Sequence, residues 1–203
     1  MSAARPATHA DVPQLARALA RAFFDDPVAQ WSCPSDKFRP FVLERFHATR
    51  LRQLLVRGEV WTTDELLSAS AWAEPGEWKT TLREDIQLAR SVIRVRSLGH
   101  PGVLARSPMV SSGLLRTERQ HPAAPPHWYL AVVGTDPTAQ GRGLAGAVLS
   151  PVLDQCDKDG VAAYLESSKE SNIAYYARLG FRVTAEHHMP RGPNLWAMWR
   201  DPA

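Results

Sequence analysis

The run Gly141–Gly146, with the sequence GRGLAG, has the residue types and spacing best suited to binding a phosphate. Glycine lets backbone N–H groups approach an anion closely. The apolar residues Leu144, Val148 and Val152 recur at helical spacing, so the run leads into a helix. The N-terminus of a helix adds about half a positive charge. The sequence therefore predicts a phosphorylated ligand at Gly141–Gly146.

A strand is predicted directly before this run. Trp128–Val133 is a short apolar segment with β-forming residues at both ends, as expected of a buried strand. Gly134–Pro137 ends the strand, because proline cannot donate to a ladder and Asp-Pro favours a turn. Strand, glycine turn and helix start thus follow one another in the order that an anion site needs.

Two other phosphate-binding patterns fit the segment less well. Gly141–Gly146 satisfies the dinucleotide pattern G-x-G-x-x-G, and Glu166 stands where the ribose-binding acid would be. In that fold, however, the first glycine follows the strand almost directly, whereas Asp136–Gln140 intervenes here. Too little chain follows Glu166 to complete a doubly wound sheet, so a dinucleotide-binding oxidoreductase is a remote alternative. The nucleoside-triphosphate loop is excluded because no Gly-Lys-Ser/Thr closes the turn.

The same stretch resembles the acyl-CoA-binding segment of the GCN5-related N-acetyltransferase (GNAT) family. That segment follows a strand with the pattern Gln/Arg-x-x-Gly-x-Gly/Ala, which Gln140–Ala145 satisfies. A second family segment, Asn…Tyr-x-x-Leu-Gly-Phe, resembles Asn172–Phe181. Both segments occur in the family's order and spacing.

Patterns in the rest of the chain predict alternating helices and strands. Asp11, with Gln14 three residues later, predicts the N-cap of a first helix, and a loop containing Trp31 follows that helix. A second helix is predicted from about Asp36 to Gly58, with Phe41 among its inward residues. The remaining predicted elements are a hairpin of Glu59–Thr63 and Leu67–Ala73, two helical pieces within Glu74–His127 of which the second spans roughly Pro108–Arg119, a helix ending at Gly160, a strand Ala162–Ser167, a helix Ser171–Leu179, and a hairpin of Phe181–Met189 and Leu195–Arg200.

This order is similar to that of the GNAT fold, so the resemblance spans essentially the whole chain and implies a single domain over residues 1–203. The fold is α/β, with a mixed central sheet of about six to seven strands flanked by helices. The resemblance implies that the sheet is splayed between the strands at 128–135 and 162–167.

One branch of the family, puromycin N-acetyltransferase, is more similar than the rest. Gln140–Leu144, Leu165–Ser167 and Tyr176–Phe181 all resemble segments of that enzyme. Residues 25–40 and 74–127, on the substrate side, match it least.

The resemblance implies acetyl-CoA as cosubstrate and assigns residues to bind it. Pantetheine would lie along the exposed strand edge, where the Val133 N–H would polarise the thioester carbonyl. The N–H groups of the glycine turn would bind the pyrophosphate. Arg142 either adds charge there or is simply solvated, and Asn172 either contacts the cofactor or caps its helix. The full predicted set is Val133, Thr135, Gln140, Gly141, Arg142, Gly143, Leu144, Ala145, Gly146 and Asn172.

Acetyl transfer needs a neutral amine and a proton for the departing thiolate. The resemblance places the family's general acid at Tyr176, whose phenol has a pKa of about 10 and stays protonated at pH 7. Glu166, at the end of a predicted strand, is the candidate base acting through water, or else a structural carboxylate. Tyr175 is expected to point to another face. No activated nucleophile is predicted, which favours direct transfer in a ternary complex.

Asp26 and Trp31 could contact a cationic aromatic substrate, or Asp26 could belong to an exposed acidic turn. The predicted function is an acetyl-CoA-dependent N-acetyltransferase acting on the primary amine of a small molecule, with an aminonucleoside antibiotic such as puromycin as one candidate. The alternatives are a protein lysine acetyltransferase and a non-catalytic acyl-CoA-binding module.

The composition of the chain limits the kinds of partner that it is expected to bind. The excess of three positive charges among 203 residues is small and dispersed, so no nucleic acid is expected, although it would suit an acidic cofactor. Cys33 and Cys156 form no metal or disulfide pattern, which fits a reducing cytoplasm. No metal site and no membrane span are predicted. A monomer and a homodimer both remain open.

Overall fold

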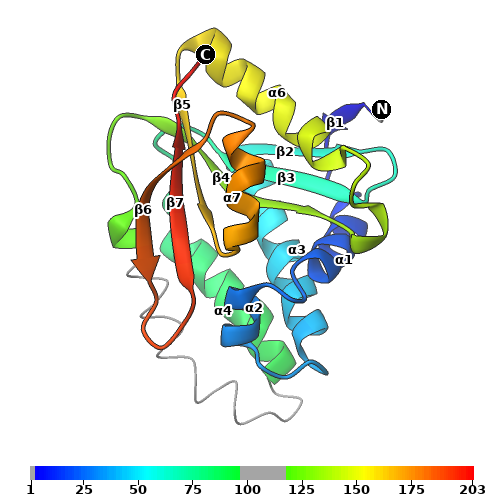
Figure 1. Cartoon of the computed structure of the whole chain (residues 1–203). Helices are drawn as coiled ribbons and strands as arrows, with labels where there is room; N and C mark the ends of the chain where they lie inside the picture. The colour runs from blue at the N-terminus through cyan, green and yellow to red at the C-terminus, as the bar shows by residue number, and fades with distance from the viewer. Residues whose placement is uncertain (1–2, 97–117) are drawn as a thin grey trace.

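The computed structural model describes residues 3–96 and 118–203. Seven strands form one mixed sheet in the order β1-β2-β3-β4-β5-β7-β6 (Figure 1). Only the β4–β5 pair is parallel among the described strand pairs. The strands are β1 (Ala4–Pro6), β2 (Gly58–Thr63), β3 (Ser68–Ala73), β4 (His127–Thr135), β5 (Ala162–Ser167), β6 (Arg182–His188) and β7 (Asn194–Arg200).

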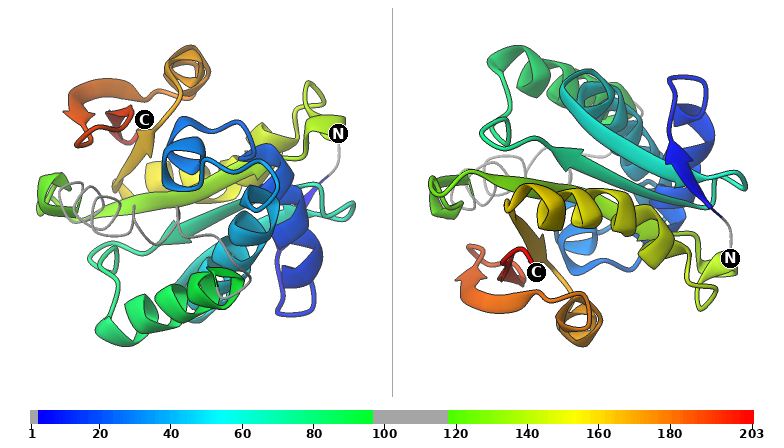
Figure 2. Two further views of the ribbon diagram at one scale, coloured as in Figure 1. Left: turned by 90° about the horizontal axis from the view of Figure 1, so that it is seen from below. Right: turned by 90° about the horizontal axis from the view of Figure 1, so that it is seen from above.

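Helices cover both faces of the sheet. Figure 2 shows α6 on one face and α1, α3 and α4 on the other. The α6 face packs Leu149, Val152 and Cys156 against β4 and β5, while α1 and α3 pack Leu15, Leu19 and Leu54 against β2, β3 and β4. The helices are α1 (Val12–Ala22), α2 (Pro27–Ser32), α3 (Arg39–Arg57), α4 (Leu82–Arg96), α6 (Leu144–Asp159) and α7 (Ile173–Ala177), with 3₁₀ turns η1 (Pro137–Ala139) and η2 (Glu170–Asn172).

The predicted splay of the sheet is confirmed. β4 and β5 pair only as far as Leu130 and Leu165, although β4 continues to Thr135. On its other edge β4 stays paired with β3, where Trp72 faces Leu130 but Ala71 faces Val132, so Ala131 is an extra residue in β4. Such a bulge bends a strand and increases its twist. β4 therefore turns away from β5 at Ala131, and from there to Thr135 its edge on the β5 side pairs with no strand among the described residues.

Most predicted elements are present with small shifts of their ends. The hairpin β2–β3, the strand β5 and the hairpin β6–β7 are confirmed. Gly180 has φ +88, the left-handed conformation that suits a helix C-cap. The predicted helix over roughly Pro108–Arg119 lies almost wholly outside the described residues. None of the described helices is long and apolar enough to cross a membrane.

Two local predictions are wrong for specific physical reasons. Asp11 stands at the N-cap of α1, but its carboxylate does not cap the helix; it accepts from the Thr8 N–H at 2.8 Å and from Arg5 Nη1 at 2.9 Å. Phe41, predicted to point inward from α3, is 59% exposed. The helix that buries Leu43, Leu51 and Leu54 rotates Phe41 to the opposite side.

A third prediction, the loop containing Trp31, is also wrong in part. Trp31 belongs to a short helix, α2, which begins at Pro27 and has Asp26 as its N-cap. The Asp26 carboxylate accepts from the N–H groups of Val28 and Ala29 at 2.9 and 3.1 Å. An Asp-Pro pair can therefore start a helix as well as a turn, because proline at the first helical position needs no acceptor.

Candidate functional site

A cleft of about 560 Å³ opens where β4 and β5 part. It is lined by β4 from Leu130 to Thr135, by the glycine turn and the start of α6, and by the end of β5 with α7. Ala22, Phe23 and Asp26, at the end of α1 and the start of α2, form part of its wall. The cleft is thus bordered by residues of β4, the glycine turn, α6, β5 and α7, and by the segment that joins α1 to α2.

The glycine turn has the conformation of an anion site. Gly141 and Gly143 have φ of +76 and +78, which L-residues with a side chain rarely adopt. A Cβ added at either would meet nothing within 4 Å, so the backbone conformation rather than space demands glycine. α6 begins at Leu144 without a side-chain cap, and its first closing bond runs from the Ala147 N–H to the Gly143 carbonyl at 3.1 Å. The N–H groups before Ala147 therefore have no acceptor within the helix and suit a pyrophosphate.

Side chains around the turn fix it to the sheet. Gln140 Nε2 donates to the Thr135 carbonyl at 3.3 Å. Asp136 is buried and accepts from the Thr138 N–H at 3.0 Å and from Arg21 Nε at 2.6 Å. Arg142 does not line the cleft; its Nη2 lies 3.6 Å from Glu65 Oε1 in the β2–β3 turn. Backbone amides thus supply the positive potential of the turn.

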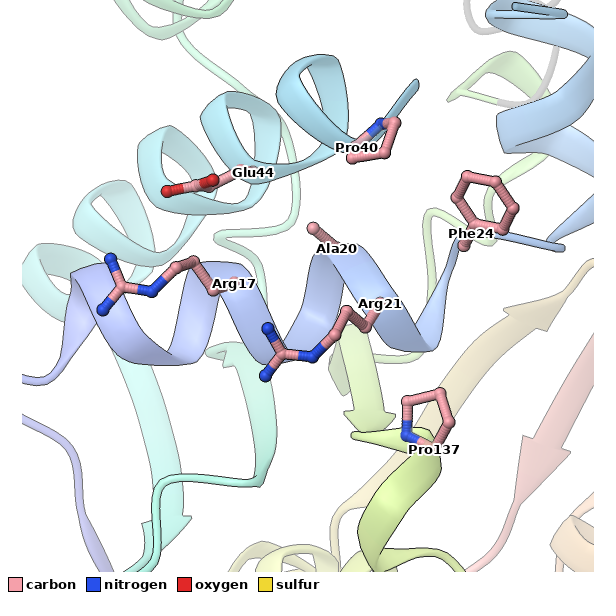
Figure 3. Close-up of a pocket in the computed structure, with 7 residues that line it drawn as sticks. All are labelled: Arg17, Ala20, Arg21, Phe24, Pro40, Glu44 and Pro137. Atoms are coloured by element: carbon pink, nitrogen blue, oxygen red, sulfur yellow. The ribbon is translucent and has the colours of Figure 1, made fainter. Parts of the chain in front are cut away.

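A second hollow, of about 390 Å³, lies between α1 and α3 outside the cleft (Figure 3). Arg17 and Arg21 from α1 and Glu44 from α3 border it, and Pro137 of the η1 turn closes one end. Arg21 is paired with the buried Asp136, so α1 is attached to the start of the η1 turn beside this hollow.

The two adjacent tyrosines of α7 both line the cleft. Tyr176 is 7% exposed, and its hydroxyl has no hydrogen-bond partner among the described residues. Burial raises the pKa of Tyr176, and Tyr175 and Asp26 raise it further. Tyr175 was expected on another face, but its buried hydroxyl lies 3.9 Å from the position of a Cβ added to Gly146 and lacks a partner in the described chain. α7 is only one turn long, so neighbouring residues can both reach the same opening.

Glu166, in β5, lines the cleft. Its carboxylate accepts from the Tyr129 hydroxyl at 2.9 Å and from the Tyr164 hydroxyl at 3.1 Å. Burial raises the pKa of Glu166, and the two hydrogen bonds oppose this shift. A buried carboxyl with a raised pKa, facing a cleft, is a candidate for taking up a proton from a bound ligand. It is also firmly bonded within the structure, so both predicted roles fit its geometry.

The remaining predicted residues divide between the cleft and the core. Asn172 lines the cleft and does not cap α7 with its side chain. Asp26 lines the cleft while capping α2, and Ser168 Oγ donates to its second oxygen. Trp31 packs against Met189 and Leu195 and does not line the cleft.

Sequence patterns did not reveal the polar cluster behind Glu166. His121 and His127 are buried there, with their Nε2 atoms 3.0 Å apart, and the Trp78 ring stacks on His121 at 3.8 Å between centroids. These residues come from three separate segments and belong to no local motif. Only the fold brings them together.

Comparisons with known proteins agree with this geometry. The sequence model of the acetyltransferase (GNAT) family matches residues 65–181. An uncharacterized N-acetyltransferase of Schizosaccharomyces pombe is 28% identical over 182 residues, covering 84% of this chain and 70% of that protein. The residues predicted to bind the cofactor, from Val133 to Asn172, lie within the matched range.

Solved structures share the fold over the whole chain. The structure described as histone acetyltransferase HPA2 and related acetyltransferase from Corynebacterium glutamicum has a TM-score of 0.69 at 24% identity, with 100% of this chain and 98% of that chain covered. Arylalkylamine N-acetyltransferase 2 from Aedes aegypti has a TM-score of 0.58 at 11% identity, with 98% of each chain covered. At such identities the likeness shows the fold alone.

Proposed function

The chain belongs to the acetyltransferase (GNAT) family and is an acyltransferase, and we propose that it transfers the acetyl group of acetyl-CoA to the primary amine of a small molecule. The proposal treats residues 1–203 as one catalytic domain. The observation that carries it is the placement of an open β4 edge, an uncapped glycine turn and the Tyr176 phenol around one cleft.

The cofactor fits this cleft by chemistry and by shape. Family members generally use acetyl-CoA, whose pyrophosphate suits the backbone N–H groups of Gly141–Gly146. The pantetheine arm carries amide groups, which can pair with the edge of β4 between Ala131 and Thr135 as a missing strand would. In the proposal Val133 and Thr135 provide those backbone partners, while Gln140 and Asn172 flank the arm.

We assign three groups of the chain to the chemistry. Glu166 accepts the proton of the acceptor ammonium through a water molecule. The Val133 N–H donates to the thioester oxygen as negative charge develops on it. Tyr176 presents its O–H to the departing sulfur, and its raised pKa keeps that proton on the phenol until the thiolate forms.

Transfer is proposed to be direct, in a ternary complex. Cys33 and Cys156 are both buried in the core, and burial raises the pKa of Cys156 to about 12. A thiol with such a pKa is not a nucleophile at neutral pH. The amine itself is therefore the attacking group.

The proposed acceptor is an amine that loses its proton easily. Deprotonating a lysine ε-amine at pH 7 costs about 4.6 kcal/mol, whereas an α-amine of pKa near 8 costs about 1.4 kcal/mol. One carboxylate acting through water suffices for the second case but gives little help with the first. Puromycin carries an α-amine, so an aminonucleoside of this kind is the first acceptor to test, and Asp26 at the cleft wall would face its cationic group.

A thiol-release screen with acetyl-CoA tests the proposal, using puromycin, other aminonucleosides, aminoglycosides and lysine peptides as acceptors. We expect turnover with a small α-amine and little with peptides. Turnover with lysine peptides alone would instead identify a protein lysine acetyltransferase. If CoA binds but no amine releases thiol, the chain is a binding module and the catalytic proposal fails.

A further inference from the structure

A buried polar cluster lies directly behind Glu166 and is not used by the mechanism above. His121, at 3% side-chain exposure, is enclosed by aromatic rings: Trp78 stacks on it, and the edges of Tyr129 and Tyr164 meet it at centroid distances of 4.8 and 4.7 Å. The imidazole is therefore fixed in place, with its two nitrogens directed at polar groups.

The hydrogen bonds of the cluster determine which nitrogen of His121 carries the proton. A backbone carbonyl can only accept, so His127 Nδ1, 2.7 Å from the Pro125 carbonyl oxygen, must carry a hydrogen. In the neutral ring His127 Nε2 is then an acceptor. Since the two Nε2 atoms are 3.0 Å apart, His121 Nε2 is the donor. Burial lowers the pKa of His121 to about 3, so its ring is neutral and its Nδ1 carries only a lone pair.

That lone pair faces Glu166. His121 Nδ1 lies 3.9 Å from Glu166 Oε1, whereas the two phenol donors lie 2.9 and 3.1 Å from the carboxylate. An ionised carboxylate and a bare nitrogen have no proton to share, which accounts for the longer separation. A proton added to Oε1 would create an O–H donor, and His121 Nδ1 presents an unshared lone pair 3.9 Å away.

We propose that His121 is a positioning residue whose Nδ1 accepts a hydrogen bond from the proton that Glu166 gains when the acceptor ammonium is deprotonated. The inference rests on the proposed function, in which Glu166 is the base. The proton leaves the ammonium nitrogen through water and binds Glu166 Oε1, and the amine lone pair then attacks the thioester carbon. The C–S bond breaks as the amide forms, the thiolate takes the Tyr176 proton, and the second proton lost by the nitrogen returns to the Tyr176 oxygen. His121 stabilises the neutral carboxyl, and the proton returns to solvent after product leaves.

The titratable groups around Glu166 and His121 support this hydrogen bond. Burial raises the pKa of Glu166 and lowers the pKa of His121 to about 3, so a proton placed between them stays on the carboxyl and His121 acts as the acceptor. The other titratable neighbours are Tyr129 and Tyr164, which burial keeps protonated, and His127, whose pKa burial lowers. From α3, the buried Arg50 acts on Tyr129 and lowers the phenol's pKa, opposing the effect of burial.

The test compares the pH profiles of kcat/KM for the same amine in three proteins. His121→Phe keeps an aromatic ring under Trp78 but removes the acceptor, whereas His121→Asn returns a carbonyl oxygen near the position of Nδ1. We expect His121→Phe to move the acid limb down by about one pH unit and to lower the plateau about tenfold, with KM for acetyl-CoA within twofold. His121→Asn should return the acid limb and the plateau most of the way to their wild-type values. An unshifted acid limb and an unchanged plateau in a folded His121→Phe protein would overturn the proposal.

Two further measurements distinguish an error in the role of His121 from an error in the assignment of Glu166 as the base. ¹⁵N chemical shifts of the histidines in the wild-type chain report the tautomer without any variant or turnover, and a His121 ring protonated at Nδ1 rather than Nε2 would overturn the proposal. Glu166→Gln should abolish the acid limb. If Glu166→Gln acetylates the amine as fast as wild type with the same profile, the base assignment in the proposed function is wrong, while acetyl transfer itself stands.

Discussion

The two sides of the cleft are built from different kinds of group. We call them the cofactor side and the acceptor side after their proposed roles. On the cofactor side, Val133–Gly146, the groups available to a ligand are backbone amides placed by glycine conformations and a strand edge. On the acceptor side, Glu166 with Tyr129, Tyr164 and His121, they are side chains that come from separate segments and bond to one another. A backbone site depends on local conformation, whereas a side-chain cluster depends on the packing of the whole fold. Substitutions should therefore affect the two sides differently.

The largest expected effect is on turnover, from Tyr176→Phe. Removing the phenol proton should lower kcat by about 10²- to 10³-fold, the usual contribution of a general acid, because the buried ring keeps its packing. The KM for acetyl-CoA should change little. Steady-state thiol release measures both constants.

Tyr175→Phe is the matched variant on the same helix. Its hydroxyl lies beside the start of α6, so its removal should act on the KM for acetyl-CoA and leave kcat within about threefold. Equal losses of kcat in the two variants would mean that α7 positions the cleft as a unit and that Tyr176 has no special chemical role.

The next effect is on stability and concerns a buried histidine behind the wall of the cleft. His47 packs against Phe23, which lines the cleft, and its two ring nitrogens have no hydrogen-bond partner within the described part of the chain. Burial lowers the pKa of His47 to about 3, below the value near 6.5 of the unfolded chain. The unfolded state then binds more protons, so folding free energy is lost as the pH falls below 6.5.

His47→Leu removes this titration. Between pH 6.5 and 5 the wild type should lose about 2 kcal/mol of unfolding free energy relative to the variant. Urea unfolding of both proteins at the two pH values measures the difference. His121 and His127 titrate in both proteins and cancel, so an equal loss would show that His47 is not held neutral in the folded state.

A smaller effect tests the backbone character of the cofactor side. Gly143→Ala places a side chain at φ +78 and should cost roughly 1–2 kcal/mol, which distorts the turn and weakens acetyl-CoA binding about tenfold. Gly160→Ala is the control at the other end of α6, where φ is +66 and an added Cβ also meets nothing within 4 Å. Both variants should lose similar stability, but calorimetry should find weaker cofactor binding only for Gly143→Ala.

The smallest effect is expected at Arg142. Its guanidinium is half exposed and lies beside Glu65, outside the cleft lining. Exposed ion pairs contribute about 0–1 kcal/mol, so Arg142→Ala should change the Kd for acetyl-CoA less than twofold. A tenfold rise in Kd would show that side-chain charge, and not only backbone, binds the cofactor.

The same contrast explains which local predictions were wrong. The predicted cap at Asp11 failed because Arg5, from β1, competes for its carboxylate. Tyr175 was assigned to another face because helix periodicity assumes a longer helix than α7. Both errors come from contacts or lengths that neighbouring residues in the sequence do not specify.

Sequence alone predicted the glycine turn and the order of helices and strands along most of the chain. Gly141, Gly143 and the strand before them carry their conformational preferences in their own backbones, so a short motif suffices to predict the turn, while the opening beside it followed from the family resemblance. Only the tertiary structure decided that His121 and His127 lie behind Glu166 and that Trp31 joins the core. Those positions result from packing between segments distant in the chain, and no pattern of neighbouring residues encodes such a contact.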